Sequence, residues 1–308
     1  MVKCPACEEV FDSYGKLASH FSGQSETSDA GHIMWLNRNI TKEKEREKEL
    51  PDLLEGFLSV EDLGLRNWIK RRFIERFFGS RPHPFVLALQ HPSRAVLLGY
   101  VLEHHHFLRQ WVRSLSWIMA KTDRDDVLKE ELDNIVTEFY GYGPDRPSHY
   151  ELLIRMGENL GMDRTSILAT PPLPDTARAI HTWQEIGEKR HWVETMAAMH
   201  SLELIANRKV KEDGATITYF DPSILTSNEI TEATKAFLRE GYEADVEHSD
   251  IPLGAVERYA TELHKVEDVQ VTFLRSMEAF DKYLTARLER GMQFDKSLVT
   301  YAMRRDAR

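Results

Sequence analysis

Apolar residues recur every three to four positions along most of the chain beyond residue 50, which is the spacing of one face of an α-helix. This pattern predicts helices near residues 52–56, 60–79, 83–90, 92–120, 124–140, 147–160, 175–208, 228–241 and 251–290. Glycine and proline predict breaks at residues 141–147, 171–174 and 214–222. Strand-like alternation is scarce apart from residues 215–220. We therefore expect an all-α fold for this part of the chain.

A run of alternating charges, T-K-E-K-E-R-E-K-E-L at residues 41–50, has no apolar periodicity and is followed by Pro51. Such a run is typical of an exposed connector between domains. With 308 residues, the chain is long enough for one large domain and a small appendage. We predict a small domain at 1–40, a charged linker at 41–50 and a helical domain at 51–308.

Composition places the chain among globular proteins, because 42% of its residues are hydrophobic and 29% are charged. A formal net charge of −10 argues against general binding to nucleic acid. The longest apolar runs are interrupted well before the ~20 residues that a membrane-spanning helix needs, and no apolar signal stretch stands at the N-terminus. We therefore expect a cytoplasmic protein that binds neither nucleic acid nor a membrane.

The N-terminal segment carries a metal-binding pattern, C-x2-C-x3-F-x5-L-x2-H, which begins at Cys4. It is typical of a ββα zinc finger of the two-cysteine, two-histidine (C2H2) type, in which Cys4 and Cys7 lie on a tight turn and His20 on a helix. Phe11 and Leu17 supply the small core that metal binding completes. The chain has only these two cysteines, and their spacing suits a metal better than a stabilising disulfide.

The fourth zinc ligand departs from the usual spacing. A second histidine normally follows the first by three to five residues, whereas the next one here is His32, after the polar stretch 22–31. We expect His32 to complete the Zn²⁺ site across a loop insertion, with Trp35 and its neighbours docking it on the large domain. Fingers that read DNA usually occur in arrays and carry basic helix residues, but this one has little more than Lys16. A structural role, or the docking of a protein partner, is the expected use.

Four places in the helical part pair carboxylates with histidines, the ligands from which helical bundles build metal sites. They are the run from Glu103 to His106, Glu138 with His149, His200 with Glu203, and His264 with Asp268. The last two residues are four apart, so both project from one helix face and can reach one ion. Glu203 lies in an otherwise apolar helix, where a buried carboxylate needs a cation such as Arg208 unless it reaches solvent.

The order of these segments resembles the haem-oxygenase-like fold shared by the TenA and PqqC proteins. Residues 100–120 look like an early helix of that fold. The segments 134–141, 148–153 and 160–162 are similar to the N-x-x-x-E-x-x-G, H-x-x-L-L and L-G-L stretches of the iron-containing haem-oxygenase-like oxidases. Residues 197–203 match their glutamate helix, and residues 259–268 match the start of their H-x-x-x-D-x-x-H helix. The resemblance covers roughly residues 85–290 and implies a haem-oxygenase-like helical bundle behind the finger.

By that resemblance, the iron ligands of the family fall on Glu138, His149, Glu203, His264 and Asp268. Where the last histidine of the pattern is expected, the chain has Val271, which cannot bind iron. Three alternatives remain open. They are a single-iron site, a two-iron site completed by Glu103, His106 or another nearby group, and a fold that has lost its chemistry.

The resemblance implies a non-haem iron oxidase or oxygenase, an oxidoreductase that binds Fe²⁺ and uses O2 to oxidise a small-molecule substrate in the bundle. The alternative from another class is a non-catalytic TenA/PqqC-like scaffold or regulator that binds a partner through its zinc finger. Within the same fold, a metal-free oxidase like PqqC stays open, and a haem protein needs a proximal histidine such as His83 or His91. A thiaminase like TenA needs a cysteine nucleophile in the bundle, whereas both cysteines lie in the finger. The oligomeric state is left open, with a homodimer as one alternative.

Overall fold

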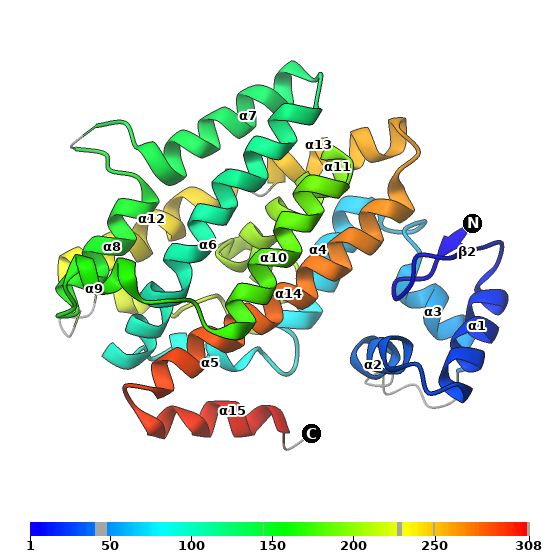
Figure 1. Cartoon of the computed structure of the whole chain (residues 1–308), viewed down its shortest axis with the longest axis horizontal. Coiled ribbons are helices and arrows are strands. Elements are labelled where there is room, and N and C mark those ends of the chain that lie inside the picture. The colour runs from blue at the N-terminus through cyan, green and yellow to red at the C-terminus, as the bar shows by residue number, and fades with distance from the viewer. Residues whose placement is uncertain (41–47, 144, 227–229, 249, 307–308) are drawn as a thin grey trace.

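The computed structural model describes residues 1–40, 48–143, 145–226, 230–248 and 250–306, without the side chains of residues 242–248 and 304–306. Figure 1 shows a large helical bundle with a small N-terminal domain at one side. The elements in chain order are β1 (Val2–Lys3), β2 (Val10–Phe11), α1 (Tyr14–Glu26), α2 (Ala30–Asn39), α3 (Leu50–Leu58), α4 (Gly64–Phe77), α5 (Pro84–Leu89), α6 (Arg94–Lys121), α7 (Asp125–Ile135), the π-helical turn η1 (Val136–Tyr140), α8 (His149–Asn159), α9 (Arg164–Ala169), α10 (Pro174–Lys189), α11 (Trp192–His200), the 3-10 turns η2 (Ser201–Ile205), η3 (Arg208–Lys211) and η4 (Pro222–Thr226), α12 (Glu232–His248), α13 (Asp250–Glu262), α14 (Val266–Met292), η5 (Lys296–Leu298) and α15 (Val299–Asp306). The predicted all-α fold with a small ββα appendage is confirmed.

The small domain begins with a two-stranded antiparallel sheet, in which Val2 pairs with Phe11 and Lys3 with Val10. Within the described residues, this is the whole sheet structure of the chain. Glu8, in the turn between the strands, has a left-handed backbone with φ of +68°. The turn is therefore tight, which brings the chain back over itself immediately after the two cysteines.

Two helices complete the small domain. The side chain of Ser13 accepts from a backbone N–H in the first turn of α1, and Asp29 caps α2 in the same way. The polar stretch 22–31 is therefore not the loop insertion that its composition predicts, because α1 continues to Glu26 and α2 begins at Ala30. Trp35 of α2 packs edge-on against Phe57 of α3, with ring centroids 5.6 Å apart.

Ion pairs tie the small domain to the bundle. Lys3 Nζ lies 2.5 Å from Oδ1 of Asp268 at the start of α14. Arg190, between α10 and α11, donates to Glu8 with Nη1 2.7 Å from Oε2. Because these partners are far apart in sequence, the contacts fix the finger against the bundle. The domain boundary within residues 41–50 stays a prediction, and residues 41–47 lie outside the described part of the chain.

Helices α6 and α14 form the centre of the bundle. Helix α14 packs against α6, α10 and α11, which places it in contact with most of the layers seen in Figure 1. At Gly99 of α6 an added Cβ atom would lie 2.2 Å from the backbone oxygen of Arg287 in α14. Only glycine allows the two backbones to approach this closely.

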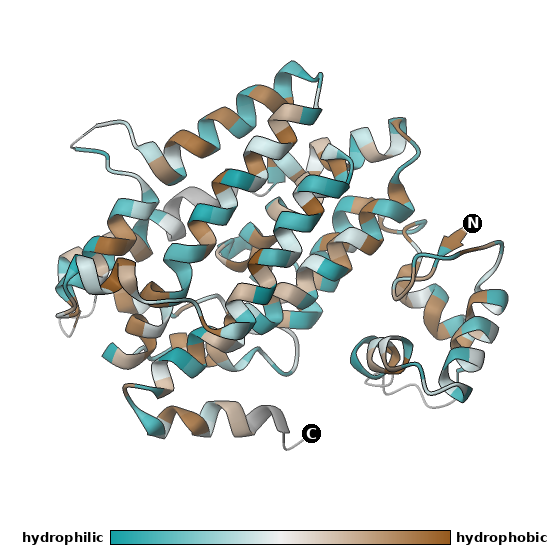
Figure 2. Cartoon of the chain, viewed as in Figure 1, coloured by the Kyte–Doolittle hydropathy of each residue, from teal (hydrophilic) through white to brown (hydrophobic). Residues whose placement is uncertain are grey.

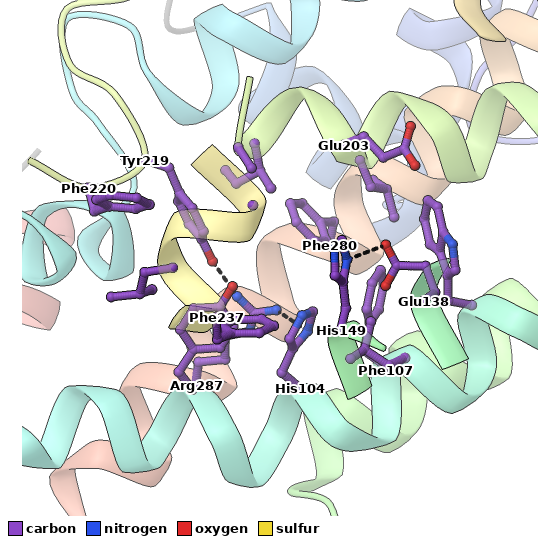
Figure 3. Close-up of a pocket in the computed structure, with 18 residues that line it drawn as sticks. His104, Phe107, Glu138, His149, Glu203, Tyr219, Phe220, Phe237, Phe280 and Arg287 are labelled. Carbon is purple, nitrogen blue, oxygen red and sulfur yellow. Dashed lines mark hydrogen bonds and ion pairs between the residues drawn. The ribbon is translucent and has the colours of Figure 1, made fainter. Parts of the chain in front are cut away.

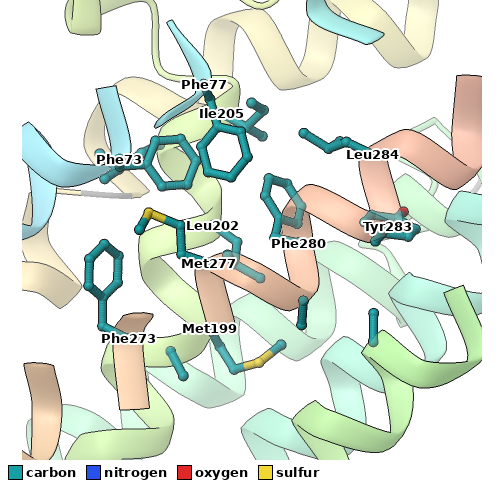
Figure 4. Close-up of a cluster of buried hydrophobic side chains, with 14 of the residues drawn as sticks. Phe73, Phe77, Met199, Leu202, Ile205, Phe273, Met277, Phe280, Tyr283 and Leu284 are labelled. Atoms are coloured by element: carbon teal, nitrogen blue, oxygen red, sulfur yellow. The ribbon is translucent and has the colours of Figure 1, made fainter. Parts of the chain in front are cut away.

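A core of aromatic and aliphatic side chains fills the space between the helices. The rings of Phe73 and Phe77 on α4 lie 4.6 Å apart, and Phe77 meets Phe280 of α14 edge-on at 5.5 Å (Figure 4). Hydrophobic and hydrophilic residues alternate along the bundle helices, as Figure 2 shows. Burial of the apolar faces in this way is the main stabilising term for such a domain.

Two long predicted helices are each divided in the structure. The segment 175–208 breaks after α10, because His191 caps a new helix and its backbone N–H interacts with the side chain of Glu194. The segment 251–290 breaks between α13 and α14, where His264 has a left-handed backbone with φ of +54°. The prediction of one continuous helix over each segment was wrong, since apolar periodicity does not reveal a single left-handed or capping residue.

Residues 215–220, the stretch with strand-like alternation, form an irregular segment that contacts Phe78 and Gln90, the residues that follow α4 and α5. The carbonyl oxygens of Thr218 and Tyr219 accept from the side chain of Gln90 instead of from a neighbouring strand. Among the helices of the described chain, none has a window long and apolar enough to span a bilayer.

Candidate functional site

The small domain brings four side chains into one tight group: Cys4, Cys7, His20 and His32. Their ligand atoms all lie within 4.8 Å of one another. Nε2 of His20 is 2.9 Å from Nε2 of His32. Sγ of Cys4 is 3.5 Å from Nε2 of His32, and Sγ of Cys7 is 3.3 Å from Nε2 of His20. Given zinc bonds of about 2.0 Å to nitrogen and 2.3 Å to sulfur, tetrahedral ligands lie about 3.3 to 3.8 Å apart. The group is therefore consistent with a structural zinc site.

The surroundings of the group also favour a cation. Burial raises the pKa of the Cys4 thiol to about 12, so a thiolate at this position needs a positive charge beside it. Nδ1 of His32 lies 2.6 Å from Oδ1 of Asp29, which leaves Nε2 for the metal. The same Asp29 oxygen caps α2, so one carboxylate both starts the helix and orients the ligand on it.

A second candidate site is a cavity inside the bundle, with about 100 Å³ of open space (Figure 3). Its walls come from α6, η1, α8, η2, the segment before η4, α12 and α14. Aromatic and aliphatic side chains dominate the lining, and polar groups are few. This combination is typical of sites that hold small organic molecules. The lining residues are Tyr100, His104, Phe107, Leu108, Trp111, Glu138, His149, Leu202, Glu203, Ile205, Ala206, Tyr219, Phe220, Phe237, Leu238, Gly241, Phe280 and Arg287.

Glu138 and His149 form one polar pair on the cavity wall. Oε1 of Glu138 lies 2.8 Å from Nδ1 of His149, and Nε2 of the same ring is 3.9 Å from Oε1 of Glu240 on α12. Glu138 lies on the π-helical turn η1, and such turns often occur at functional sites. The turn ends at Gly141, where φ is +80° and an added Cβ would be 2.7 Å from the backbone nitrogen of Ser148. The close return of the chain at this glycine places His149, at the start of α8, beside Glu138.

Glu203 enters the cavity from η2, within a buried polar network. Its Oε1 accepts from Nδ2 of Asn134 at 3.1 Å, and its Oε2 lies 3.2 Å from Nδ1 of His200. Nε2 of His200 in turn lies 2.9 Å from Oε1 of Glu131. Burial would lower the pKa of His200, but the two carboxylates outweigh it and hold the pKa well above 6.5. The cation that the sequence requires beside Glu203 is therefore protonated His200, not Arg208.

A buried arginine lies at the other end of the cavity. Arg287 of α14 contacts the hydroxyl groups of Tyr219 and Tyr283 and Nδ1 of His104. The distance from Nη2 to the imidazole nitrogen is 2.6 Å. Burial, reinforced by the arginine charge, lowers the pKa of His104 well below 6.5, so this ring is neutral. The end of the cavity thus carries one positive charge among uncharged hydrogen-bonding groups.

His264 and Asp268, predicted on one helix face at the same metal site, are not among the residues that line the cavity. His264 is exposed in the turn between α13 and α14, so the two residues do not share a continuous helix. Asp268 pairs with Lys3 of the small domain and Lys265. Val271 is buried on α14 away from the cavity lining, so its lack of a ligand atom does not affect this site.

The additional candidates also have other partners. Glu103 is fully buried and accepts from Arg290 at 2.6 Å, which satisfies its charge. His106 lies 2.9 Å from the carbonyl oxygen of Thr170. His83 accepts from a backbone N–H in the first turn of α5 and does not line the cavity.

Sequence reasoning missed Glu131 and Arg287 as parts of this site, whereas His104 belongs to the run from Glu103 to His106 that the sequence singled out. Glu131 lies four residues after buried Val127 on α7, so a carboxylate on an apolar helix face was the available signal. Arg287 lies seven residues after Phe280 on the buried face of α14. An arginine on an otherwise apolar helix face was the available signal, because burying a charge is costly.

The donor types in the cavity suit iron, since carboxylates and imidazoles are the usual protein ligands of non-haem iron. Glu138, His149 and Glu203 all line one cavity, which the resemblance predicts. The ligand atoms of these three residues lie further apart than those of the finger. In the described part of the chain, the finger group alone has its ligand atoms within 4.8 Å of one another. The residues fit an iron site in their chemistry, and binding would require them to move closer together.

Comparisons with known proteins agree with this architecture. Residues 68–290 match the model of the TENA/THI-4/PQQC family, and residues 1–59 match a C2H2 type zinc finger in one copy. Among curated proteins, none matches the chain by sequence.

Solved structures share the fold at low identity. A domain of unknown function with a heme oxygenase-like fold from Shewanella denitrificans is 13% identical with a TM-score of 0.55, covering 80% of this chain and 95% of that one. A cadd-like protein of unknown function from Nostoc punctiforme is 18% identical, with a TM-score of 0.52 and coverage of 74% and 97%. A TenA homolog from Pseudomonas syringae pv. tomato is 15% identical, with a TM-score of 0.51 and coverage of 79% and 92%. With a haem oxygenase-like bundle and a family match across most of its length, the chain belongs to the TENA/THI-4/PQQC family.

Proposed function

We propose that the protein is an iron-dependent oxidase whose metal is held by Glu138, His149 and Glu203. The observation that carries the proposal is that these three residues, from η1, α8 and η2, line one mostly apolar cavity. The bundle brings them there from segments up to 65 residues apart.

Bound iron would supply the reduction of O2, and the chain supplies orientation and exclusion of water. A carboxylate can only accept, so in this structure Glu138 holds the proton of His149 on Nδ1. Glu138 would leave this contact when it and Nε2 of His149 bind one iron, because the two ring nitrogens point in different directions. Protonated His200 and Asn134 hold the two oxygens of Glu203 in place. The aromatic wall excludes bulk water from the substrate.

Helix α12 completes the cavity on the side facing α8, where the sequence prediction expected α13 and α14. Glu240 of α12 lies near His149, and the sequence continues from Gly241 through Asp245 and His248. This spacing matches the D-x-x-H end of the pattern that the resemblance assigns to the last ligand helix. The side chains of Asp245 and His248 lie outside the described part of the structure, and variants must test their role.

The direct test is metal analysis of protein produced with iron and zinc supplied, followed by O2 consumption of the Fe²⁺ form. We expect one zinc and one or two irons per chain. The variants Glu203→Ala and His149→Ala should lose iron and keep zinc, and His248→Ala tests whether this histidine is a further ligand. The matched control is His264→Asn, because asparagine tolerates the left-handed backbone at this exposed position. Zinc without iron in the parent protein, or full iron content in Glu203→Ala, would overturn the proposal.

The second candidate function is a non-catalytic scaffold that binds a protein partner through its finger. It is favoured by the contrast between the gathered zinc ligands and the more widely separated cavity carboxylates among the described residues. In that case the parent protein should contain zinc alone and consume no O2 in the presence of Fe²⁺. Metal content therefore separates the two functions.

A further inference from the structure

We infer that the cavity binds a small organic monocarboxylate, with the ligand's carboxylate paired to Arg287 and its apolar body against the aromatic wall. The inference rests on the proposed function only in taking this cavity as the substrate site. Iron binding does not require a carboxylate ligand of this class. The monocarboxylate inference and the proposed iron-dependent function can therefore fail separately.

The first observation is that Arg287 is a buried cation without an anionic partner. It is 2% exposed, and its polar contacts go to tyrosine hydroxyls and an imidazole nitrogen. Across the described residues, no carboxylate lies within ion-pair distance of its guanidinium group. Arg290, one turn further along α14, has Glu103 at 2.6 Å. A buried charge is costly unless it is paired, so Arg287 is the side chain for which a counter-ion is missing.

Two of the aromatic neighbours of Arg287, Tyr100 and Tyr283, do not supply that negative charge. Burial raises the pKa values of Tyr100 and Tyr283, so both phenols stay neutral. The guanidinium carbon lies 4.2 Å from the ring centre of Tyr100 and 4.4 Å from that of Tyr283. These ring faces help the protein to tolerate the cation when no ligand is bound, but they leave its charge uncompensated.

The guanidinium group also has an unused donor. Nε of Arg287 is buried and has no hydrogen-bond partner, although the residue lines the cavity. A carboxylate accepts two parallel N–H bonds from an arginine, so the free Nε–H and the adjacent nitrogen are suited to an anion more than to water. In Figure 3 the guanidinium group lies at one end of the cavity with His104 and Tyr219.

The opposite end limits the ligand to one negative charge. Figure 3 shows Glu138 and His149 on the side of the cavity away from Arg287. A second anionic group on the ligand would approach the carboxylates of Glu138 and Glu203. The ligand that fits is therefore acidic at one end and apolar along its body, such as a small aromatic or branched aliphatic acid. This orientation would present the apolar end to the proposed iron site.

The test uses the full-length, zinc-loaded and iron-free protein in calorimetric titrations. The probes are benzoate, phenylacetate and isobutyrate, each compared with its neutral amide, and phenyl phosphate as a dianionic probe. We expect at least one carboxylate to bind at least tenfold more tightly than its amide and than phenyl phosphate. Equal binding of acid and amide, tighter binding of phenyl phosphate, or no binding of any carboxylate would overturn the inference without involving iron.

Variants then locate the anion. Arg287→Gln should remove the preference for the acid over the amide, whereas Arg275→Gln, on the same helix but at the surface beside Glu185, should retain it. Arg287→Gln protein is compared only if its helical content and zinc content match the parent. If this variant does not fold, Arg287→Lys serves instead, because it keeps the charge but loses the forked geometry, and it should weaken benzoate at least threefold. An unchanged preference in a folded Arg287 variant would overturn the assignment of the anion to this residue.

Discussion

Nε2 of His200 lies 2.9 Å from Oε1 of Glu131, and neither side chain has any exposed surface. The pair joins α11 to α7 behind the cavity, and the other nitrogen of the same ring contacts Glu203. The buried imidazolium of His200 lies between the two carboxylates and holds Glu203 in place. The charge state of this ring therefore decides how Glu203 is presented to the cavity.

Removal of the imidazole should destabilise the protein strongly. His200→Ala leaves the carboxylate of Glu131 buried without its cation, which costs about 3 to 5 kcal/mol of unfolding free energy. The measurement is urea unfolding monitored by circular dichroism. The double variant His200→Ala, Glu131→Ala should recover part of this loss, because it removes the unpaired charge as well. A loss below about 1 kcal/mol in the single variant would show that the pair does not carry this charge.

His200 should not titrate near neutral pH. Its folded pKa is raised well above 6.5 by Glu131 and Glu203, so we expect the ring to stay protonated at neutral pH, and the measurement spans pH 5.5 to 8. The ring resonances of His200 in NMR spectra, assigned by their absence in His200→Gln, should keep their chemical shifts across this range. A shift with a midpoint near 6.5 would contradict the ion pair.

His105 should make the fold sensitive to acid. Burial lowers its pKa to about 3, so the unfolded chain binds a proton below pH 6.5 that the folded chain does not bind. Stability from this residue therefore falls as the pH decreases from 6.5 towards 3, by about 2 kcal/mol between pH 7 and 4.5. His105→Leu should reduce the loss of unfolding free energy over this interval, measured by urea unfolding at both pH values. His181→Gln, at an exposed position, should leave it unchanged; equal pH dependence in His105→Leu and the parent would show that His105 is not the acid-sensitive group.

Asp29 should tune the zinc site without contacting the metal. Asp29→Asn keeps a cap for α2 but loses the charge beside Nδ1 of His32, so zinc affinity should fall about 10- to 100-fold. Competition with a chromophoric chelator measures the affinity. Asp12→Asn is the matched control, because Asp12 is an exposed acid of the same finger that pairs with Lys16. Equal zinc affinity in both variants would remove Asp29 from the site.

Most of the finger could be predicted from the sequence, because its ligands are set by short-range spacing. The spacing of Cys4, Cys7 and His20 follows from a turn and one helix, and the structure gathers them as predicted. His32 joins them too, but from a second helix instead of a loop. The polar composition of residues 22–31 concealed two helix ends, since serine and aspartate serve equally in loops and in caps.

The residues that line the cavity could be predicted only in part from the sequence. Glu138, His149 and Glu203 line one cavity as the resemblance predicts, whereas His264 and Asp268 do not. Helical spacing assumes a continuous helix, and the left-handed backbone at His264 breaks it. One partner of Asp268 is Lys3, 265 residues away, and no local pattern predicts such a pair.

The sequence by itself determined the helical class, the cysteine and histidine group of the finger, and the presence of carboxylates and histidines within apolar helices, because periodicity and short-range spacing encode these features. Only the tertiary structure decided which of those polar residues meet. Helix α12 instead of α14 faces His149, His200 becomes the cation of Glu203, and Arg287 is left in an aromatic cavity without an anion. The physical reason is that burial and pairing depend on contacts between segments far apart in the chain. These contacts set both the charge of a side chain and the free-energy cost of burying that charge.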